Sequence, residues 1–330
     1  KNNDISFYPG WHPDKMIENG APDIVVVGNV AGTTNQEFIY ARKNNLNYKS
    51  YPEVIAEHIV QKNSLVCAGT YGKTSTTALL TFILERADMN PSYMFGGLSL
   101  NLPESAKIKS NDNSWSVLEG DEYKTARWDS RPKFKLYSPT HLLLTSVSWD
   151  HADIYPTEET YLQAFKDLVG MIPSAGLIVA CMDDAKIKGV LTGNINGAKE
   201  ITYGKDPAAD YFYSPVEQTA DGISFAIKHA GVEYKINAPV LGEHMAENIC
   251  GAFAMAKEIG IEEKTVLNAI SEFKGIKRRL EKRSGPQGGP FGSRIAVYDD
   301  LGHSPAKAAA TLRTLRAIYP NNKIIAIFEP

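Results

Sequence analysis

The chain has 330 residues, of which 43% are hydrophobic and 22% are charged. This composition excludes a disordered chain, a collagen-like fibre and a small disulfide scaffold. The 35 Lys and Arg residues against 38 Asp and Glu residues give a net charge of −3, so no basic field is available to bind nucleic acid or an anionic membrane. At roughly 150 residues per domain, the length predicts two or three domains.

The three cysteines, Cys67, Cys181 and Cys250, are widely separated and form neither a CxxC pair nor the spacing of a metal site. We expect them to be buried free thiols in a reducing compartment. No stretch reaches the roughly 20 apolar residues that span a bilayer, and no signal-peptide core follows the first residues. The sequence therefore predicts a cytoplasmic protein with no membrane partner.

The first half of the chain alternates strand patterns with helix patterns. Short apolar runs predict strands at residues 24–27, 65–68, 93–95, 116–119, 141–146 and 177–181. Helix patterns lie between several of them, at residues 35–43, 51–61, 76–87 and 158–169. This alternation is typical of an α/β fold in which helices cover a parallel sheet.

The second half of the chain has a different pattern of apolar and polar residues. Residues 201–236 are short alternating runs separated by turn signals, which predict a small antiparallel patch, and residues 243–259 predict a long helix. Residues 284–290 are dense in Gly and Pro without periodicity, which predicts a linker or hairpin. The predicted unit that follows consists of a strand, a helix and a strand at residues 295–298, 305–318 and 323–328.

A glycine-containing loop, Gly69-Thr70-Tyr71-Gly72-Lys73-Thr74-Ser75, joins the strand at 65–68 to the following helix. Glycines let backbone N–H groups close around phosphates, and the helix N-terminus adds the positive end of its dipole. In such loops the lysine contacts the β- and γ-phosphates and the hydroxyl after it holds Mg²⁺. Cys67 stands where the full pattern has a small residue, so the match is GxxGKT. We predict an ATP phosphate site; the alternative is a structural strand–helix turn.

Acidic residues and a histidine follow two other predicted strands. Glu119 closes one strand, and Asp150 and His151 come shortly after another. These side chains should lie at the carboxyl edge of the sheet, where open α/β sheets bind ligands. Together with Thr74 they could form a magnesium cage, in which His151 would be an unusual ligand. The alternative is that they are ordinary surface-loop residues.

Two further runs carry little information alone. Residues 277–281 form a basic cluster that could be a solvated face, and residues 299–305 could be a helix-capping sequence. Taken in chain order with the features above, however, they resemble the signature positions of the Mur ligases of bacterial cell-wall synthesis. The positions that carry this resemblance are Gly69–Thr74, Glu119, Asp150-His151, Gly242-Glu243-His244 through Asn248, Arg278-Arg279 and Asp299-Asp300.

The resemblance implies an α/β, three-domain architecture. Residues 1–62 would be part of an N-terminal UDP-binding domain, and residues 63–283 a central P-loop ATPase domain with a parallel sheet. Residues 284–330 would be a linker and part of a C-terminal Rossmann-like domain. We therefore expect the N- and C-terminal domains to be incomplete in this chain, and the chain by itself to bind ATP weakly and not to ligate.

The resemblance also implies roles for individual residues. The catalytic residues would be Lys73, Glu119, His151 and Arg279, and Mg²⁺ would be held by Thr74, Glu119 and His151. ATP would be bound by residues 69–75 together with Asn248, Arg279 and Asp300. A UDP-sugar would bind at Asn29, Gly96, Gly97 and Asn101, because glycines after a strand permit a close backbone approach; the alternative is two structural turns.

The implied reaction is ATP-dependent amide formation through an acyl phosphate, with UDP-N-acetylmuramate and a cell-wall peptide as substrates. Residues 122–123, 129–134 and 149–151 are most similar to the branch that joins L-alanyl-γ-D-glutamyl-meso-diaminopimelate to UDP-N-acetylmuramate in peptidoglycan recycling. The nearest alternative is the branch that adds L-alanine. A P-loop ATPase and a nucleotide-binding module without ligase activity are the others.

Several positions depart from the family pattern. Tyr71 replaces a His or Asn, Met245 replaces an Asn, and Ser304 replaces a second histidine. Several relatives carry a carbamylated lysine as a second magnesium bridge. Phe165 stands at that position here, which fits the two branches named above, and Lys166 is adjacent.

Overall fold

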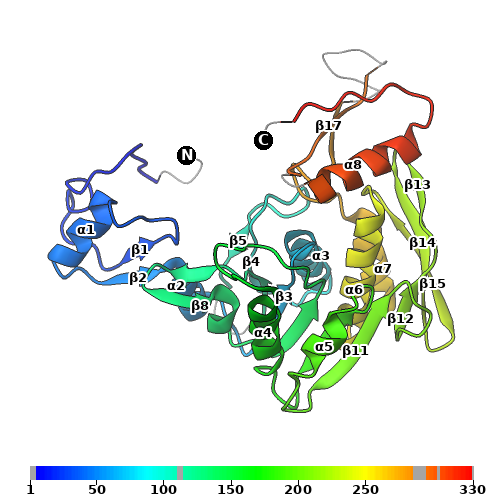
Figure 1. The fold of residues 1–330 in the computed structure, drawn as a ribbon, viewed down its shortest axis with the longest axis horizontal. Helices are drawn as coiled ribbons and strands as arrows, with labels where there is room; N and C mark the ends of the chain where they lie inside the picture. Colours follow the sequence, from blue (N-terminus) through cyan, green and yellow to red (C-terminus); the bar gives the residue numbers. More distant parts are fainter. Residues whose placement is uncertain (1–4, 110–113, 285–294, 303–304, 329–330) are drawn as a thin grey trace.

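The computed structural model describes residues 5–109, 114–284, 295–302 and 305–328. Three parts follow one another along the chain: an N-terminal unit, a central sheet with its helices, and a C-terminal segment that ends in α8 (Figure 1). The predicted mixed α/β fold with a mostly parallel sheet is confirmed.

Eleven strands of the described chain form one sheet, in the order β13-β14-β12-β11-β10-β9-β3-β6-β4-β5, with β15 paired to β14. The neighbours from β12 to β4 in this order are parallel, and β5, β13, β14 and β15 are attached by antiparallel pairing. The strands are β3 (Asn63–Ala68), β4 (Ser92–Met94), β5 (Ala106–Lys107), β6 (Trp115–Gly120), β9 (His141–Leu144), β10 (Leu177–Cys181), β11 (Lys199–Gly204), β12 (Tyr211–Tyr213), β13 (Glu217–Thr219), β14 (Gly222–His229) and β15 (Val232–Ala238).

Between β3 and β9, which are parallel, the side of the sheet on which the next strand is added reverses. The crossover from β3 through α3 (Lys73–Arg86) leads toward β4, whereas the crossover from β9 through α4 (Glu158–Val169) leads to β10 on the other side. Because such crossovers are right-handed, α3 and α4 cover opposite faces of the sheet. The carboxyl ends of β3 and β9 therefore border a crevice at the reversal point, where open α/β sheets bind ligands.

Burial explains the central elements. Five of the six residues of β3 are buried, as expected for a strand covered on both faces. The helix α3 is buried from Thr76 to Leu84 because it packs against both α6 (Glu243–Glu258) and α7 (Glu263–Glu272). On the other face α4 packs beside the short helix α5 (Ile187–Leu191). The three cysteines are buried free thiols, as predicted.

The N-terminal unit is a small parallel sheet with two helices. In this unit β1 (Val25–Val27) pairs with β2 (Tyr48–Ser50), and α1 (Gln36–Lys43) joins the two strands. Helix α2 (Tyr51–His58) begins at a capping box formed by Ser50 and Glu53 and ends three residues before the predicted boundary. The unit lies at one end of the molecule, next to the hairpin of β7 (Lys124–Ala126) and β8 (Asp129–Pro132), which leads into the 3₁₀ helix η1 (Lys133–Leu136) (Figure 1).

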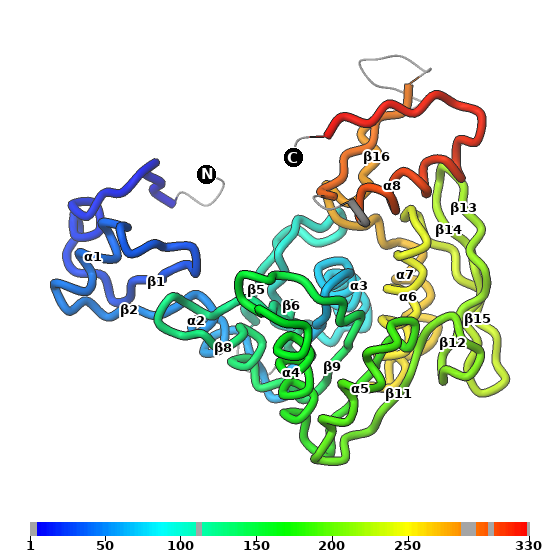
Figure 2. The backbone as a smooth tube through the Cα atoms, in the orientation of Figure 1, coloured from blue at the N-terminus to red at the C-terminus, as the bar shows by residue number. Residues whose placement is uncertain are grey.

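The C-terminal segment consists of β16 (Glu281–Ser284), its antiparallel partner β17 (Val297–Asp299), and α8 (Pro305–Ile318). Helix α8 lies beside β13 at the far end of the central sheet (Figure 2). Most of the predicted linker at 284–290 falls outside the described residues.

Three predicted elements need correction. The helix predicted from residue 76 begins at Lys73, because Gly72 adopts a left-handed conformation that starts the helix there. The patch predicted at 201–236 is antiparallel among β12, β13, β14 and β15, as predicted, but it belongs to the main sheet, and β11 and β12 pair in parallel. Residues 323–328 form no strand, since among the described residues β17 pairs only with β16 and offers them no hydrogen-bonded neighbour.

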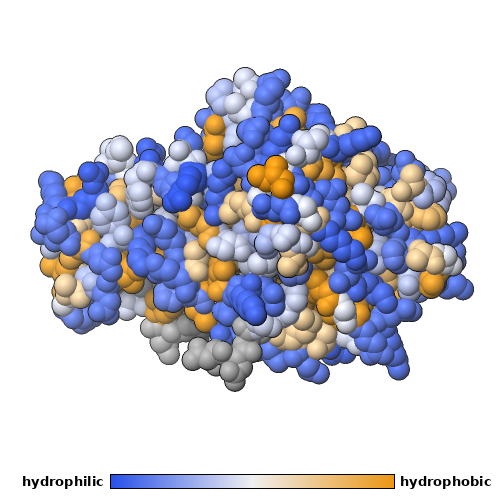
Figure 3. All heavy atoms as spheres, turned by 90° about the horizontal axis from the view of Figure 1, so that it is seen from below, coloured by the Kyte–Doolittle hydropathy of each residue, from blue (hydrophilic) through white to orange (hydrophobic). Residues whose placement is uncertain are grey.

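The surface agrees with the composition. The face seen from below in Figure 3 is mainly hydrophilic, with its apolar residues dispersed among polar ones. Among the described helices none is both long enough and apolar enough to span a bilayer.

Candidate active site

The loop between β3 and α3 requires glycine at two positions. Gly69 has φ +131°, and a Cβ there would lie 2.3 Å from Thr145 Oγ1 and 2.7 Å from the carbonyl oxygen of Ser146. Gly72 has φ +81°, and a Cβ there would lie 2.3 Å from Oδ1 of Asn248 on α6. The loop is therefore pressed against the end of β9 on one side and against α6 on the other.

Hydrogen bonds from the segment after β9 fix the shape of this loop. The backbone N–H of Thr70 donates to the carbonyl of Ser146 (2.9 Å), and that of Tyr71 donates to Ser146 Oγ (3.0 Å). Thr145 Oγ1 donates to the carbonyl of Tyr71 (2.5 Å). These three bonds tie the loop to the segment after β9 and do not involve the Lys73 side chain.

Lys73 is held by a buried carboxylate. Its Nζ donates to the carbonyl of Gly69 (2.6 Å) and to Glu122 Oε2 (2.8 Å). Only 1% of the Glu122 side chain is exposed, and the hydroxyl of Tyr155 donates to its backbone carbonyl (2.7 Å). The Lys73 ammonium group, which is predicted to contact a phosphate, is therefore paired with the Glu122 carboxylate.

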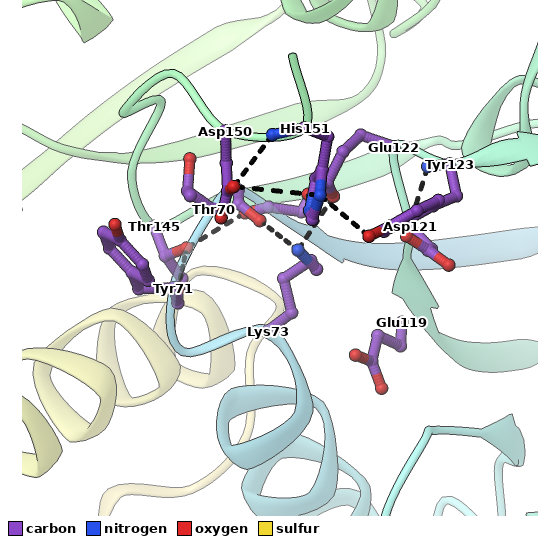
Figure 4. A network of polar contacts seen from close by, with 12 residues as sticks. Thr70, Tyr71, Lys73, Glu119, Asp121, Glu122, Tyr123, Thr145, Asp150 and His151 are labelled. Carbon is purple, nitrogen blue, oxygen red and sulfur yellow. Dashed lines mark hydrogen bonds and ion pairs between the residues drawn. The ribbon is translucent and has the colours of Figure 1, made fainter. Parts of the chain in front are cut away.

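The same carboxylate reaches His151. Nε2 of His151 lies 3.4 Å from Glu122 Oε1, and Nδ1 lies 2.7 Å from the hydroxyl of Tyr123. The Glu122 contact raises the pKa of His151 above its ordinary value, with a further contribution from Asp150. His151 also has a left-handed backbone, with φ +60°, and its N–H donates to Asp150 Oδ1 (2.8 Å). Figure 4 shows Lys73, Glu122 and His151 pointing toward one another.

A second carboxylate stands beside this group. Glu119 is the second-last residue of β6. Its Oε1 accepts a hydrogen bond from Thr74 Oγ1 (2.7 Å), and its Oε2 accepts from the backbone N–H of Gly96 (2.6 Å). A hydroxyl and a carboxylate at this distance are hard oxygen donors of the kind that Mg²⁺ prefers. The chemistry of Thr74 and Glu119 thus fits a magnesium ion. His151, the third predicted ligand, has its two ring nitrogens against Glu122 and Tyr123, and Figure 4 shows it with Glu119 near Lys73.

The other predicted ATP residues come from α6 and from the chain after α7. Asn248 is buried, with its amide against Gly72. Arg279 is half-buried on the chain that leads from α7 to β16. Asp300 joins two segments, because its Oδ1 accepts from the N–H of Leu280 (3.1 Å) and its Oδ2 accepts from Thr311 Oγ1 (2.7 Å).

The predicted UDP-sugar residues are not all brought together. Gly96 and Gly97 lie against Thr74 and Glu119: the N–H of Gly96 donates to Glu119, and a Cβ at Gly97 would be 3.0 Å from Thr74 Cγ2. Asn101 instead anchors the end of α7, donating to the carbonyl of Glu272 (2.8 Å) and accepting from the N–H of Lys274 (2.7 Å). Asn29 lies two residues after the end of β1, a strand that Figure 1 shows away from α3.

The model of the Mur ligase middle domain matches residues 67–256, which is more than half of the chain. The chain belongs to the Mur ligase family. It is 34% identical over 315 residues to the UDP-N-acetylmuramate–L-alanyl-γ-D-glutamyl-meso-2,6-diaminoheptandioate ligase of Haemophilus influenzae, covering 94% of this chain and 66% of that protein. It is 31% identical over 325 residues to the UDP-N-acetylmuramate–L-alanine ligase of Renibacterium salmoninarum, covering 97% and 66%. The chain thus spans about two thirds of the length of these curated relatives.

Solved structures agree with this family assignment. The UDP-N-acetylmuramate:L-alanyl-γ-D-glutamyl-meso-diaminopimelate ligase of Neisseria meningitidis superposes with a TM-score of 0.73 at 28% identity, over 82% of this chain and 84% of that one. A murein peptide ligase of Psychrobacter arcticus gives a TM-score of 0.73 at 26% identity, over 93% and 65%.

In this chain the structure adds two site residues that the sequence did not single out for a role. Glu122 and Tyr123 follow Glu119 in an acidic run that looks solvent-exposed, yet they link Lys73 to His151. The signal that could have revealed them is proximity to Glu119 at the end of a strand. Phe165, predicted to stand where several relatives carry a modified lysine, is fully buried, contacts Phe134 and Tyr161, and belongs to the core.

Proposed function

We propose that this chain carries the ATP-binding centre of a ligase that joins a peptide to the lactyl carboxylate of UDP-N-acetylmuramate. The observation that carries the proposal is the grouping of Lys73, the Thr74–Glu119 pair and His151 at the reversal point of the sheet. The peptide is taken to be L-alanyl-γ-D-glutamyl-meso-diaminopimelate, because a ligase of that printed specificity shares 34% identity with 94% of the chain.

The reaction would have two steps. An oxygen of the lactyl carboxylate attacks the γ-phosphorus of ATP, and the bond from that phosphorus to the β–γ bridging oxygen breaks, giving an acyl phosphate and ADP. The peptide amine then attacks the acyl carbon, the C–O bond to phosphate breaks, and the amine loses a proton. A free carboxylate is a poor acyl donor, so phosphorylation supplies the leaving group that amide formation needs.

The residues of the chain mainly position reactants and offset charge. Backbone N–H groups of the loop and the start of α3 would surround the phosphates, and Lys73 would exchange Glu122 for a phosphate oxygen. Glu122 would then release Nε2 of His151, the ring nitrogen open to a metal, while Tyr123 keeps the ring in place through Nδ1. Mg²⁺, held by Thr74, Glu119 and His151, would supply positive charge to the phosphate oxygens. Asn248 would contact the adenine, and Arg279 and Asp300 would complete the site from the C-terminal side.

A second candidate is a ligase that adds L-alanine to the same nucleotide sugar, because a relative of that printed name shares 31% identity over 97% of the chain. Both reactions consume ATP and UDP-N-acetylmuramate, which we place in the cytoplasm. They differ only in the amine.

Mass spectrometry of the products separates the candidates. The full-length gene product is incubated with ATP, Mg²⁺ and UDP-N-acetylmuramate, and with either the tripeptide or L-alanine at equal concentration. The proposal expects UDP-N-acetylmuramoyl-tripeptide as the main product. Predominant UDP-N-acetylmuramoyl-L-alanine would favour the second candidate, and phosphate release that needs neither amine nor sugar would indicate an ATPase.

A further inference from the structure

A lysine of α8 reaches the phosphate loop. The ammonium group of Lys307, near the start of α8, lies 5.4 Å from the centre of the Tyr71 ring. Tyr71 is 39% exposed, and its backbone is fixed by Thr145 and Ser146, so the ring stands out from a rigid loop toward the C-terminal segment. This contact directly joins α8 to the predicted ATP site.

Other bonds hold the start of α8 in this place. The N–H of Leu301 donates to the carbonyl of Arg278 (2.8 Å). Asp300 accepts from the N–H of Leu280 on one oxygen and from Thr311 of α8 on the other. The position of Lys307 over the loop is therefore determined by several polar contacts besides the one to Tyr71.

The electrostatic surroundings of Lys307 are mixed. Its pKa is lowered, first by burial and then by Arg279 and Lys73, while Asp150 and Glu122 act in the opposite direction. Arg279 and Lys73, from two other segments, thus act on the charge of Lys307. Like charges gathered in a partly buried place repel one another, and a bound polyanion relieves that repulsion.

We propose that Lys307 is a nucleotide-binding residue, whose ammonium group moves from the Tyr71 ring to the terminal phosphate of ATP. The ring holds the cation in position while the site is without nucleotide, since a cation over an aromatic face is stabilised but can be displaced by a phosphate. When ATP binds, the Lys307 ammonium group of α8 then forms an ion pair with this phosphate. This inference rests on the proposed function for the identity of the nucleotide.

Direct binding measurements test the role without requiring ligation. Calorimetry gives the dissociation constants of a non-hydrolysable ATP analogue, of ADP and of UDP-N-acetylmuramate for the wild type, for Lys307→Met and for Lys307→Arg. Loss of one charge-assisted bond should weaken binding of the ATP analogue by about tenfold in Lys307→Met, and Lys307→Arg should recover most of it. Binding of ADP and of the UDP-sugar should change by less than about threefold. Lys323→Met, an exposed lysine after α8, is the matched control.

The possible results show whether Lys307 contacts the phosphate of ATP or that of the UDP-sugar. An ATP-analogue affinity within about twofold of wild type in Lys307→Met would overturn the inference. A loss confined to the UDP-sugar would also overturn it, because the phosphate contacted would then be that of the sugar nucleotide. If Lys307→Met unfolds, Lys307→Gln at matched melting temperature takes its place. A selective ATP effect without any ligase product would retain this inference and refute the proposed function.

Discussion

Glu122 is the residue on which the arrangement of the site depends. Its side chain is 1% exposed and contacts both Lys73 and His151. The carboxylate therefore holds both of these side chains in position. A buried carboxylate without its cation is strongly unfavourable. Changes at Lys73 should therefore alter stability as well as activity.

Lys73→Ala should reduce ATP turnover by about 100-fold or more, because the cation that neutralises the transferred phosphoryl group is lost. It should also lower the free energy of unfolding by about 1–3 kcal/mol, because Glu122 loses its partner. Steady-state kinetics and chemical denaturation measure the two effects. The double variant Lys73→Ala/Glu122→Gln should regain stability without activity. Turnover within about threefold of wild type would refute the phosphate-loop assignment.

Glu247 on α6 gives a pH-dependent contribution to stability. Burial, aided by the nearby Asp183, raises the pKa of Glu247 to about 7. The folded protein therefore holds a proton that the unfolded chain has released above pH 4.5, so stability falls as pH rises from about 4.5 to 7. Glu247→Gln should abolish this loss, which we place at about 1–3 kcal/mol, in denaturation curves at pH 5 and pH 8. Exposed Glu243 on the same helix, changed to Gln, is the control; equal pH dependence in wild type and Glu247→Gln would contradict the assignment.

At the scale of elements, the contact between the phosphate loop and α6 sets the geometry of the site. Gly72→Ala combines a left-handed backbone with a Cβ 2.3 Å from Asn248 Oδ1. Gly197 has φ +69° and nothing within 4 Å of its added Cβ, so Gly197→Ala reports the backbone cost alone. Gly72→Ala should cost about 1 kcal/mol or more beyond Gly197→Ala, and a cycle with Asn248→Ala should show coupling of similar size. Additive effects in that cycle would mean that loop and helix are independent.

The elements also show how far sequence reasoning reaches. The bounds of β10, α4 and α8 follow from apolar runs and helical periodicity, because burial on a sheet or a helix face leaves that pattern in the sequence. Residues 323–328 carry a strand pattern but form no strand, since pairing depends on a neighbour that local sequence does not specify. The role of Glu122 was likewise hidden, because its partners lie far along the chain: Lys73 is 49 residues before it, and Tyr155, which binds its backbone carbonyl, is 33 residues after it.

At the scale of the whole molecule, an aromatic contact joins the N-terminal unit to the central one. Trp128, at the turn between β7 and β8, stacks on Phe38 of α1 at 5.1 Å and meets the edge of Tyr48 of β2 at 5.4 Å. Such ring pairs contribute about 0.5–1.5 kcal/mol each beyond the area they bury. The contact is therefore expected to hold the predicted sugar-binding unit at a fixed place beside the central sheet.

Trp128→Ala should release this unit, whereas Trp128→Phe should largely keep it. Hydrogen exchange followed by mass spectrometry should show protection in α1 and β2 falling by about tenfold in Trp128→Ala, with α3 and α6 unchanged. Affinity for UDP-N-acetylmuramate should fall in parallel, and affinity for the ATP analogue should stay as in wild type. Unchanged protection of α1 would show that other contacts hold the unit.

The central claim is that the phosphate loop, Glu119 and His151 couple ATP cleavage to activation of a carboxylate. The most direct measurement follows oxygen. UDP-N-acetylmuramate labelled with ¹⁸O in its lactyl carboxylate is turned over with ATP and tripeptide by the full-length protein, and the released phosphate is analysed by mass spectrometry. An acyl phosphate intermediate predicts that each phosphate carries a single ¹⁸O from the carboxylate. Unlabelled phosphate, formed at the same rate as product, would contradict it.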